Sequence, residues 1–257
     1  MTAKPKKYIV ANWKMNFNVH DSSVFLYKLD SATSAHRDTE IVLAPSFLAL
    51  QTMSLQHDRR KFKLASQNLY WHDEGAFTGE VSANQLRGLV KYALVGHSER
   101  RHIFGEKGRD IGRKVQASVR NNIQPILCVG ETSFERQEGE TNDVLHDQIV
   151  GGLSNVTSDE MSQVLIAYEP VWAIGSGKSA MPDEIKQASE VIRENIHHLF
   201  GANVAKKVPI LYGGSVSPDN ASAFLNTDGI DGLLVGGASL DVDEFVKIIE
   251  IAHSLKS

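Results

Sequence analysis

Eight short apolar runs recur along the chain, and each is followed by a loop and a helix-like stretch. They span residues 8–13, 41–44, 62–66, 92–95, 125–129, 164–168, 208–212 and 232–235. The runs are rich in β-branched residues and lack polar alternation, which is typical of parallel strands covered on both faces. No Pro-, Gly- or Ser-rich linker interrupts the alternation, so residues 1–257 are expected to form one domain.

Helix signals accompany the strand pattern. Apolar residues recur over 21–36 and predict a helix there. Pro182 suits a first helical position, and Asp183 and Glu184 are favourable to the positive end of the helix dipole. Gly201 is a natural end for the same helix.

The length of the chain favours one arrangement of these units. Eight strand–helix units in 257 residues leave about 32 residues per unit, which fits a closed parallel barrel. The competing architecture is an open, doubly wound sheet. Its usual signal, G-x-G-x-x-G after the first strand, is absent, because that strand ends in Asn12-Trp13-Lys14. The sequence therefore predicts an α/β protein built as a closed (β/α)8 barrel.

Charge and cysteine content exclude several classes of protein. The chain has 27 basic and 31 acidic residues, and its net charge of −4 argues against non-specific nucleic-acid binding. A single cysteine, Cys128, excludes an intramolecular disulfide framework and fits a reducing cytoplasm. The run at 8–11 is too short for a signal peptide, and no apolar run approaches about 18 residues, so no membrane span is expected.

Polar residues follow several predicted strands at their carboxyl ends, where barrels of this type carry their active sites. A helix that begins just after His97 would favour the neutral form of its imidazole ring, and Glu99 is placed to hold Lys14. The candidate residues at these strand ends are Asn12, Lys14, Gln67, Asn68, His97, Ser98, Glu99 and Glu169.

Glycine-rich turns follow the seventh and eighth strands, at 212–215 and 236–239. Glycine lets backbone N–H groups approach an anion, and these two turns form the frequent phosphate site of such barrels. One turn of this kind would more often be only a tight connection between strand and helix. Two adjacent turns favour a phosphate site.

The loop after the sixth strand predicts a lid. It begins beside the Glu169 carboxylate, and permanent exposure of its Trp172 and Ile174 side chains would be costly. A lid beside a carboxylate indicates a base that works with water excluded. The predicted lid consists of Pro170, Val171, Trp172, Ala173, Ile174, Gly175, Ser176, Gly177, Lys178, Ser179 and Ala180.

Other chemistries find no support in the sequence. His97 and His102 are five residues apart and His197-His198 are sequential, so no metal site is expected from their spacing. No G-x-S-x-G elbow is present, which argues against a serine hydrolase. The GKS ending at 177–179 lacks the first glycine of a P-loop.

Five motifs together closely resemble those of the triosephosphate isomerase family, in order and over essentially the whole chain. The resemblance implies a (β/α)8 barrel that interconverts dihydroxyacetone phosphate and D-glyceraldehyde 3-phosphate, in glycolysis and gluconeogenesis, without metal or organic cofactor. The motifs are ANWKMN at 11–16, GAFTGE at 75–80, GHSERR at 96–101, YEPVWAIG at 168–175 and YGGS at 212–215.

The same resemblance implies roles for individual residues. Glu169 matches the general base, and His97 matches the electrophile that polarises the substrate carbonyl. Lys14 and Asn12 match groups that bind the substrate oxygens and stabilise developing negative charge. The family's supporting residues are matched by Ser98, Glu99 and Tyr212. The backbone N–H groups of its phosphate site are matched by those of Gly175, Ser215, Gly236 and Gly237.

Segment 75–80 resembles the family's dimer loop, with Thr78 at the tip and Phe77 beside it, and this implies a homodimer.

Ser176 stands in the lid where threonine is commoner in the family. Cys128 is interpreted as small and buried. Two alternatives stay open: another phosphate-binding barrel enzyme, and a non-catalytic barrel that serves as a scaffold.

Overall fold

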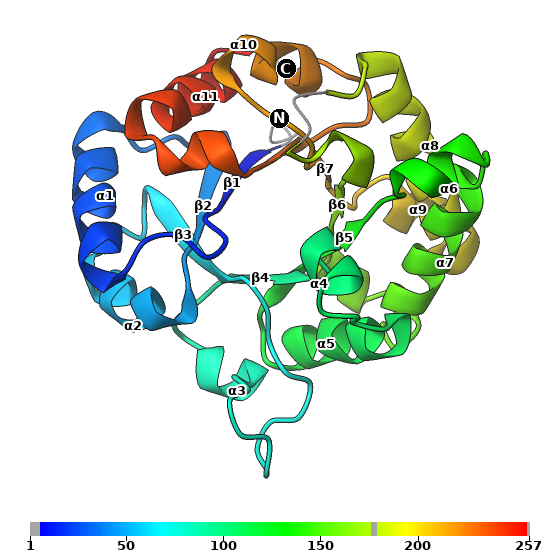
Figure 1. The fold of residues 1–257 in the computed structure, drawn as a ribbon, viewed down its shortest axis with the longest axis horizontal. Coiled ribbons are helices and arrows are strands. Elements are labelled where there is room, and N and C mark those ends of the chain that lie inside the picture. The colour runs from blue at the N-terminus through cyan, green and yellow to red at the C-terminus, as the bar shows by residue number, and fades with distance from the viewer. Residues whose placement is uncertain (1–5, 176–178, 256–257) are drawn as a thin grey trace.

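The computed structural model describes residues 6–175 and 179–255. Eight parallel strands pair in chain order and close into a barrel, because β1 pairs with both β2 and β8 (Figure 1). The predicted closed (β/α)8 barrel is thereby confirmed. The strands are β1 (Lys7–Asn12), β2 (Thr39–Ala44), β3 (Phe62–Ser66), β4 (Tyr92–Val95), β5 (Gln124–Val129), β6 (Leu165–Tyr168), β7 (Ile210–Tyr212) and β8 (Gly232–Val235).

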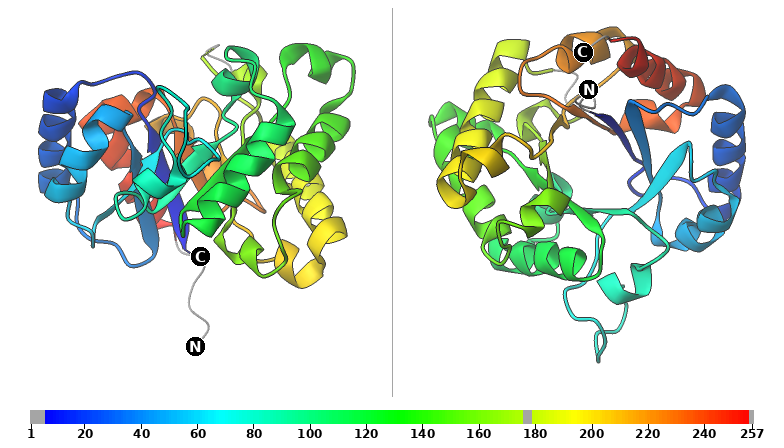
Figure 2. Two further views of the ribbon diagram at one scale, coloured as in Figure 1. Left: turned by 90° about the horizontal axis from the view of Figure 1, so that it is seen from below. Right: turned by 180° about the vertical axis from the view of Figure 1, so that it is seen from behind.

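Helices surround the strands as an outer ring (Figures 1 and 2). The α-helices are α1 (Val19–Ala32), α2 (Phe47–Gln56), α3 (Ala83–Leu86), α4 (Ser98–His102), α5 (Gly108–Arg120), α6 (Ser133–Gln137), α7 (Thr141–Leu153), α8 (Pro182–Phe200), α9 (Ala202–Ala205), α10 (Pro218–Leu225) and α11 (Val242–Ser254). Short 3-10 helices are η1 (Glu160–Gln163), η2 (Val171–Ala173) and η3 (Gly237–Leu240). Over residues 6–175 and 179–255, no helix combines the length and apolar character needed to cross a membrane.

Barrel closure requires one close backbone approach. Gly232 stands opposite Tyr8 in the β1–β8 ladder. A Cβ atom at Gly232 would lie 2.1 Å from the carbonyl oxygen of Tyr8, so only glycine fits there. From this point the ladder runs to Ala11 opposite Val235 and brings both strand ends to the same rim.

Two apolar layers hold the strands in place. Alternate side chains fill the barrel interior, whereas their neighbours, such as Ile9 and Leu43, pack outward against the helices. Cys128 lies in the interior layer, and its thiol is free and buried. The interior layer comprises Val10, Val42, Ala44, Ala65, Tyr92, Leu94, Ile126, Cys128, Leu165, Ala167, Leu211 and Leu234.

The predicted helix over 21–36 was wrong at both ends. α1 begins after Asn18, whose side chain accepts a hydrogen bond from the Asp21 amide, and ends at Ala32. No large apolar side chain follows Leu29 to be buried, so residues 33–38 form a loop instead. The seventh predicted strand, 208–212, is shorter than expected: β7 begins at Ile210, although the Pro209 carbonyl still accepts from the Ile166 amide at 3.0 Å.

A buried carboxylate, that of Glu40, lies at the amino-terminal end of the barrel. Glu40 accepts hydrogen bonds from Lys6, from Lys91 Nζ at 2.5 Å and from the Tyr92 hydroxyl at 2.6 Å. Burial alone raises the pKa of Glu40, but these three donors outweigh burial and lower it to about 2.

Replacement of this carboxylate should destabilise the fold in a pH-dependent way. Glu40→Gln is expected to cost about 3 kcal/mol of unfolding free energy near neutral pH. The folded-state pKa lies below the unfolded value of 4.5, so the contribution is present above that pH and is lost as the pH falls toward about 2. The unfolding free energies of wild type and variant, measured with urea, should therefore become equal in acid. The exposed Glu138→Gln serves as control, and a difference that stays constant with pH would contradict the assignment.

Candidate active site

An acid–base pair lies in the mouth of the barrel, at the carboxyl ends of the strands. Glu169 directly follows β6, and His97 follows β4 as the N-cap of α4. His97 Nε2 lies 3.0 Å from Glu169 Oε1, and the Ser98 amide donates to Glu169 Oε2 at 2.9 Å. Both side chains are buried, so the strand-end positions bring a carboxylate and an imidazole into direct contact away from water.

The protonation of this pair is set by opposing effects. Burial lowers the pKa of His97, but the Glu169 and Glu99 carboxylates together outweigh burial and raise it above its usual value. The Glu99 amide donates to His97 Nδ1 at 3.3 Å, which favours a single ring proton on Nε2. Burial raises the pKa of Glu169, but His97 and the Ser98 amide lower it further than burial raises it. If Glu169 turned away, burial and the Glu99 amide would both favour a neutral imidazole.

Lys14 is held in a strained turn next to this pair. Its φ of 53° is in the left-handed region, which costs a residue with a side chain about 1–3 kcal/mol. The Asn12 side chain accepts from the Lys14 amide at 3.1 Å, and Gln67 Nε2 donates to the Lys14 carbonyl at 2.8 Å. The Lys14 ammonium lies 2.6 Å from Glu99 Oε1. These contacts fix the ammonium at the barrel mouth.

The glycine turn after β8 adjoins the lysine. A Cβ atom at Gly236 would lie 3.7 Å from Lys14 Cε, and the space around Gly237 is open. Gly237 begins the short helix η3, and Ser215 stands in the turn after the neighbouring strand β7. Gly175 has a φ of 66°, a conformation that favours glycine. The turn after β8 therefore lies beside a cation, which is compatible with a phosphate site.

Both described parts of the predicted lid, 170–175 and 179–180, form hydrogen bonds with β7 or with the turn that follows it. Ser215 Oγ donates to the Ala173 carbonyl at 2.6 Å, and the Ala180 amide donates to the Tyr212 hydroxyl at 3.3 Å. Val171, Trp172 and Ala173 form η2. Ser176, Gly177 and Lys178 lie outside the described residues.

Comparison with known proteins decides the family. The model of the triosephosphate isomerase family matches residues 7–252. The chain belongs to the triosephosphate isomerase family. It is 42% identical to the triosephosphate isomerase of Alkaliphilus metalliredigens over 246 residues, 95% of this chain and 98% of that protein. It is also 42% identical to the triosephosphate isomerase of Pediococcus pentosaceus, over 94% of this chain and 96% of that protein. The identity to the triosephosphate isomerase of Citrifermentans bemidjiense is 42% as well, over 96% of this chain and 99% of that protein.

One polar contact of this triosephosphate isomerase site escaped the sequence analysis. Glu131 is fully buried and accepts from Trp172 Nε1 at 2.8 Å and from the Tyr168 hydroxyl at 3.1 Å. The Arg136 guanidinium lies 4.3 Å above the Trp172 ring. Glu131 follows the run 125–129 at the strand end, so the rule that selected Glu169 would also have selected it.

Two further arrangements around the site also depend on tertiary contacts. A Cβ atom at Gly130 would lie 1.8 Å from the Glu169 carbonyl oxygen, so glycine lets the chain after β5 approach the backbone of Glu169. Arg101 donates to the carbonyls of Gly96 at 2.7 Å and Cys128 at 2.8 Å, and it ties the His97 turn to β5.

Several sequence candidates lie outside the mouth. Asn68 turns to α5, where its side chain accepts from Lys114 Nζ at 2.8 Å. Burial raises the pKa of the Cys128 thiol, which keeps it protonated and a poor nucleophile. Phe77 stacks on His72 with ring centroids 4.8 Å apart, and Thr78 beside it is exposed.

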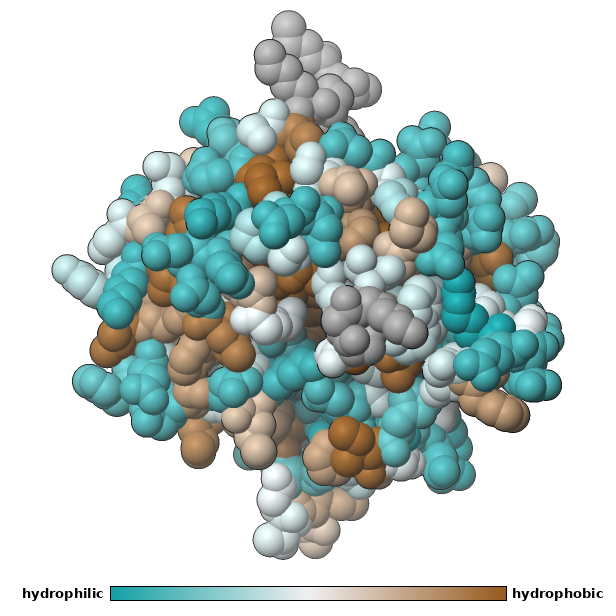
Figure 3. Space-filling model, turned by 45° about the horizontal axis from the view of Figure 1, so that its top comes forward, coloured by the Kyte–Doolittle hydropathy of each residue, from teal (hydrophilic) through white to brown (hydrophobic). Residues whose placement is uncertain are grey.

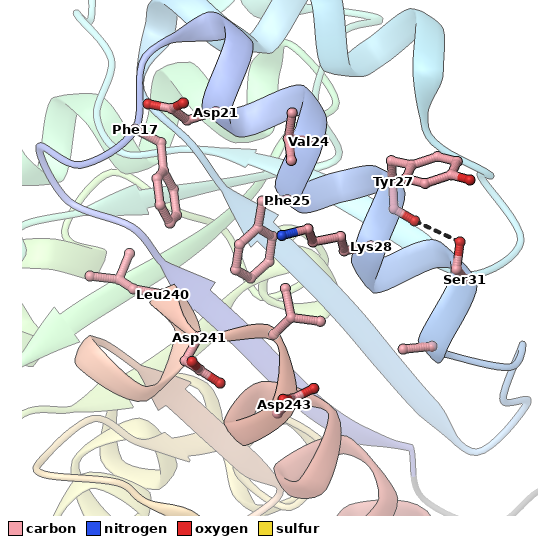
Figure 4. Close-up of a pocket in the computed structure, with 12 residues that line it drawn as sticks. Phe17, Asp21, Val24, Phe25, Tyr27, Lys28, Ser31, Leu240, Asp241 and Asp243 are labelled. Carbon is pink, nitrogen blue, oxygen red and sulfur yellow. Dashed lines mark hydrogen bonds between the residues drawn. The ribbon is translucent and has the colours of Figure 1, made fainter.

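A separate surface groove of about 920 Å³ lies on the flank of the barrel, between α1 and the start of α11. Phe17, Phe25 and Lys28 line it together with Asp241 and Asp243 (Figure 4). The groove contains neither Glu169 nor His97, so its size does not make it the reaction site.

Loss of the Glu131 charge should loosen the lid hinge. Glu131→Gln replaces a charged acceptor of the Trp172 and Tyr168 hydrogen bonds by a neutral one, and hydrogen bonds to charged groups contribute about 1.5–3 kcal/mol. We expect kcat/KM to fall about tenfold, a loss of about 1.4 kcal/mol. Trp172→Phe should act in the same direction, and the double variant should be less than additive. Additive losses would show that the two side chains act separately.

Proposed function

We propose that Glu169, His97, Lys14 and Asn12 catalyse the reaction of this family in this chain. As a member of the family, the chain is an enzyme that interconverts dihydroxyacetone phosphate and D-glyceraldehyde 3-phosphate, in glycolysis and gluconeogenesis. The observation that carries the residue assignment is the contact between Glu169 and His97, 3.0 Å apart and buried beside the mouth.

The chemistry follows from what these groups exchange. The Glu169 carboxylate takes the proton from the carbon next to the substrate carbonyl, and His97 Nε2–H donates to the carbonyl oxygen. The enediolate so formed carries negative charge that Lys14 and Asn12 stabilise. Protonated Glu169 returns its proton to the neighbouring carbon, and His97 recovers one from the other oxygen. The proton balance closes without a cofactor.

The resting contacts of Glu169 also bear on its strength as a base. While Oε1 faces His97 and Oε2 accepts from the Ser98 amide, the pKa of Glu169 is lowered and the carboxylate is a weak base. Turning toward substrate removes both contacts, and burial then raises the pKa. We infer that the base strengthens as it leaves its resting position.

Phosphate supplies binding energy away from the reacting carbons. We assign the cradle to Lys14 and to the backbone N–H groups of Gly175, Ser215, Gly236 and Gly237. Residues 170–180 act as the lid, held on β7 through Tyr212 and Ser215. Phosphate binding would favour closure, and closure excludes the water that would let the enediolate eliminate phosphate.

The assignment of the base is tested by Glu169→Gln in a coupled assay with D-glyceraldehyde 3-phosphate. The amide keeps the shape of the carboxylate but cannot accept the proton, so kcat should fall about 10²–10⁴-fold while the fold is retained. Retained turnover would exclude Glu169 as the base. A folded wild type without activity would instead indicate a barrel that serves as a scaffold.

We propose further that residues 1–257 form one catalytic domain that works as a homodimer in the cytoplasm. Met15, next to Lys14, is 98% exposed, and Leu48 after β2 and Ile103 and Phe104 after β4 are exposed apolar residues. The loop carrying Phe77 and Thr78 protrudes beside this region, and apolar side chains gather near it (Figures 1 and 3). Isolated exposure of so many apolar side chains is unfavourable, and a second copy would cover them.

The dimer is tested by light scattering, where wild type should show twice the 28.3 kDa of one chain. Thr78→Arg places a charge at the loop tip and should shift the mass toward one chain and lower activity. Gln137→Arg, on the exposed side of α6, is the matched control and should leave the mass unchanged. A fully active single chain at assay concentration would contradict the proposal.

A further inference from the structure

A cluster of nitrogen and oxygen ligands lies at the amino-terminal end of the barrel, opposite the active site. His36 and Asp38 stand in the loop between α1 and β2, and Glu250 and His253 stand three residues apart on the last turns of α11. Residues three apart on a helix share one face, and the Glu-x-x-His pattern is known to ligate metal ions. All four line a surface cavity of about 790 Å³, together with Arg37.

The geometry of the cluster is close to that of a metal site. One ligand atom each from His36, Asp38 and His253 lies within 4.8 Å of the others. His253 Nδ1 lies 2.9 Å from Asp38 Oδ1, and His36 Nε2 lies 3.3 Å from Glu250 Oε1. A tetrahedral ion about 2.0–2.1 Å from each ligand requires separations of about 3.3 Å. Binding therefore requires rotation of the His36 and His253 rings, whose centroids lie 4.0 Å apart, and of Glu250, which is near His36 but outside the group of three.

The His36 imidazole is the observation that points to a ligand. Its side chain is only 7% exposed, and Nε2 is buried without a hydrogen-bond partner among the described residues. The nearby Glu250 oxygen is within ion-pair distance but does not form a hydrogen bond with this nitrogen. A buried, unpaired ring nitrogen costs free energy, and coordination to a metal ion would satisfy it.

We propose that His36, Asp38, His253 and Glu250 bind one Zn²⁺ ion. Two imidazoles and two carboxylates are the donors that zinc accepts in four-coordinate sites, whereas Mg²⁺ and Ca²⁺ prefer oxygen donors alone. Two carboxylates neutralise the charge of the ion, and the carboxyl end of α11 provides a further favourable field for a cation. The ion would fasten the loop 33–38 to the last helix, far from the catalytic mouth.

The experiment titrates chelator-treated full chain with zinc chloride in a calorimeter. We expect one ion per chain, and weak or no binding of Mg²⁺. His36→Gln and His253→Gln should each weaken zinc binding at least about tenfold, since even loss of an outer hydrogen bond costs 10–100-fold. The double variant His197→Gln/His198→Gln removes two exposed histidines of α8 and should bind as wild type does. Equal affinity in wild type, His36→Gln and His253→Gln would overturn the proposal.

Two readouts separate binding from a merely structural role. Zinc should raise the melting temperature of wild type but not that of His36→Gln, whatever the metal-free melting temperature of the variant. Turnover of wild type should stay unchanged at the zinc concentration that saturates the site. Inhibition that follows the titration and persists in His253→Gln would place the ion in the catalytic mouth and refute the assignment.

Discussion

Closure of the parallel barrel is the constraint on which the rest of the structure depends. A parallel sheet has no free edge only if its first and last strands meet, and here they meet because Gly232 admits the Tyr8 carbonyl. Once closed, the ladder sends every strand end to the same rim. Asn12, His97 and Glu169 are far apart in the sequence, and closure alone brings them around one opening.

Within that opening, charged groups are stable because each has a partner. Glu169 has His97 and the Ser98 amide, and Lys14 has Glu99. An unpaired charge at such depth would cost several kcal/mol. In the proposed mechanism, substrate oxygens and phosphate take the place of these partners. On that proposal, these contacts position the charged groups in the free protein and are replaced when substrate binds.

The sequence predicted the barrel well because buried parallel strands leave a strong local signal. All eight strands are present, and the turn glycines and strand-end polar residues follow from their bounds. The sequence analysis failed where a structural feature depends on tertiary contacts rather than on the local sequence pattern. The end of α1 depends on which apolar side chains remain to be buried after Leu29. Glu131 follows a predicted strand and could have been selected, but its contact with Trp172, which comes from η2 after β6, is not visible in the local pattern. The cluster of His36 and His253 joins residues 217 positions apart, which no spacing rule can detect.

The amino-terminal end of the barrel contributes to stability, whereas the carboxyl end carries the candidate active site. At the amino-terminal end, Glu40 is satisfied by Lys6, Lys91 and Tyr92, and nothing there needs to move. At the carboxyl end, Lys14 keeps a left-handed backbone, and the contacts of Glu169 with His97 and the Ser98 amide lower the pKa of that carboxyl. Strain of this kind persists only where surrounding structure is rigid. The hydrogen-bonded residues at the amino-terminal end help to keep the barrel rigid, so the mouth can retain the strained Lys14 backbone and the buried pair of Glu169 and His97.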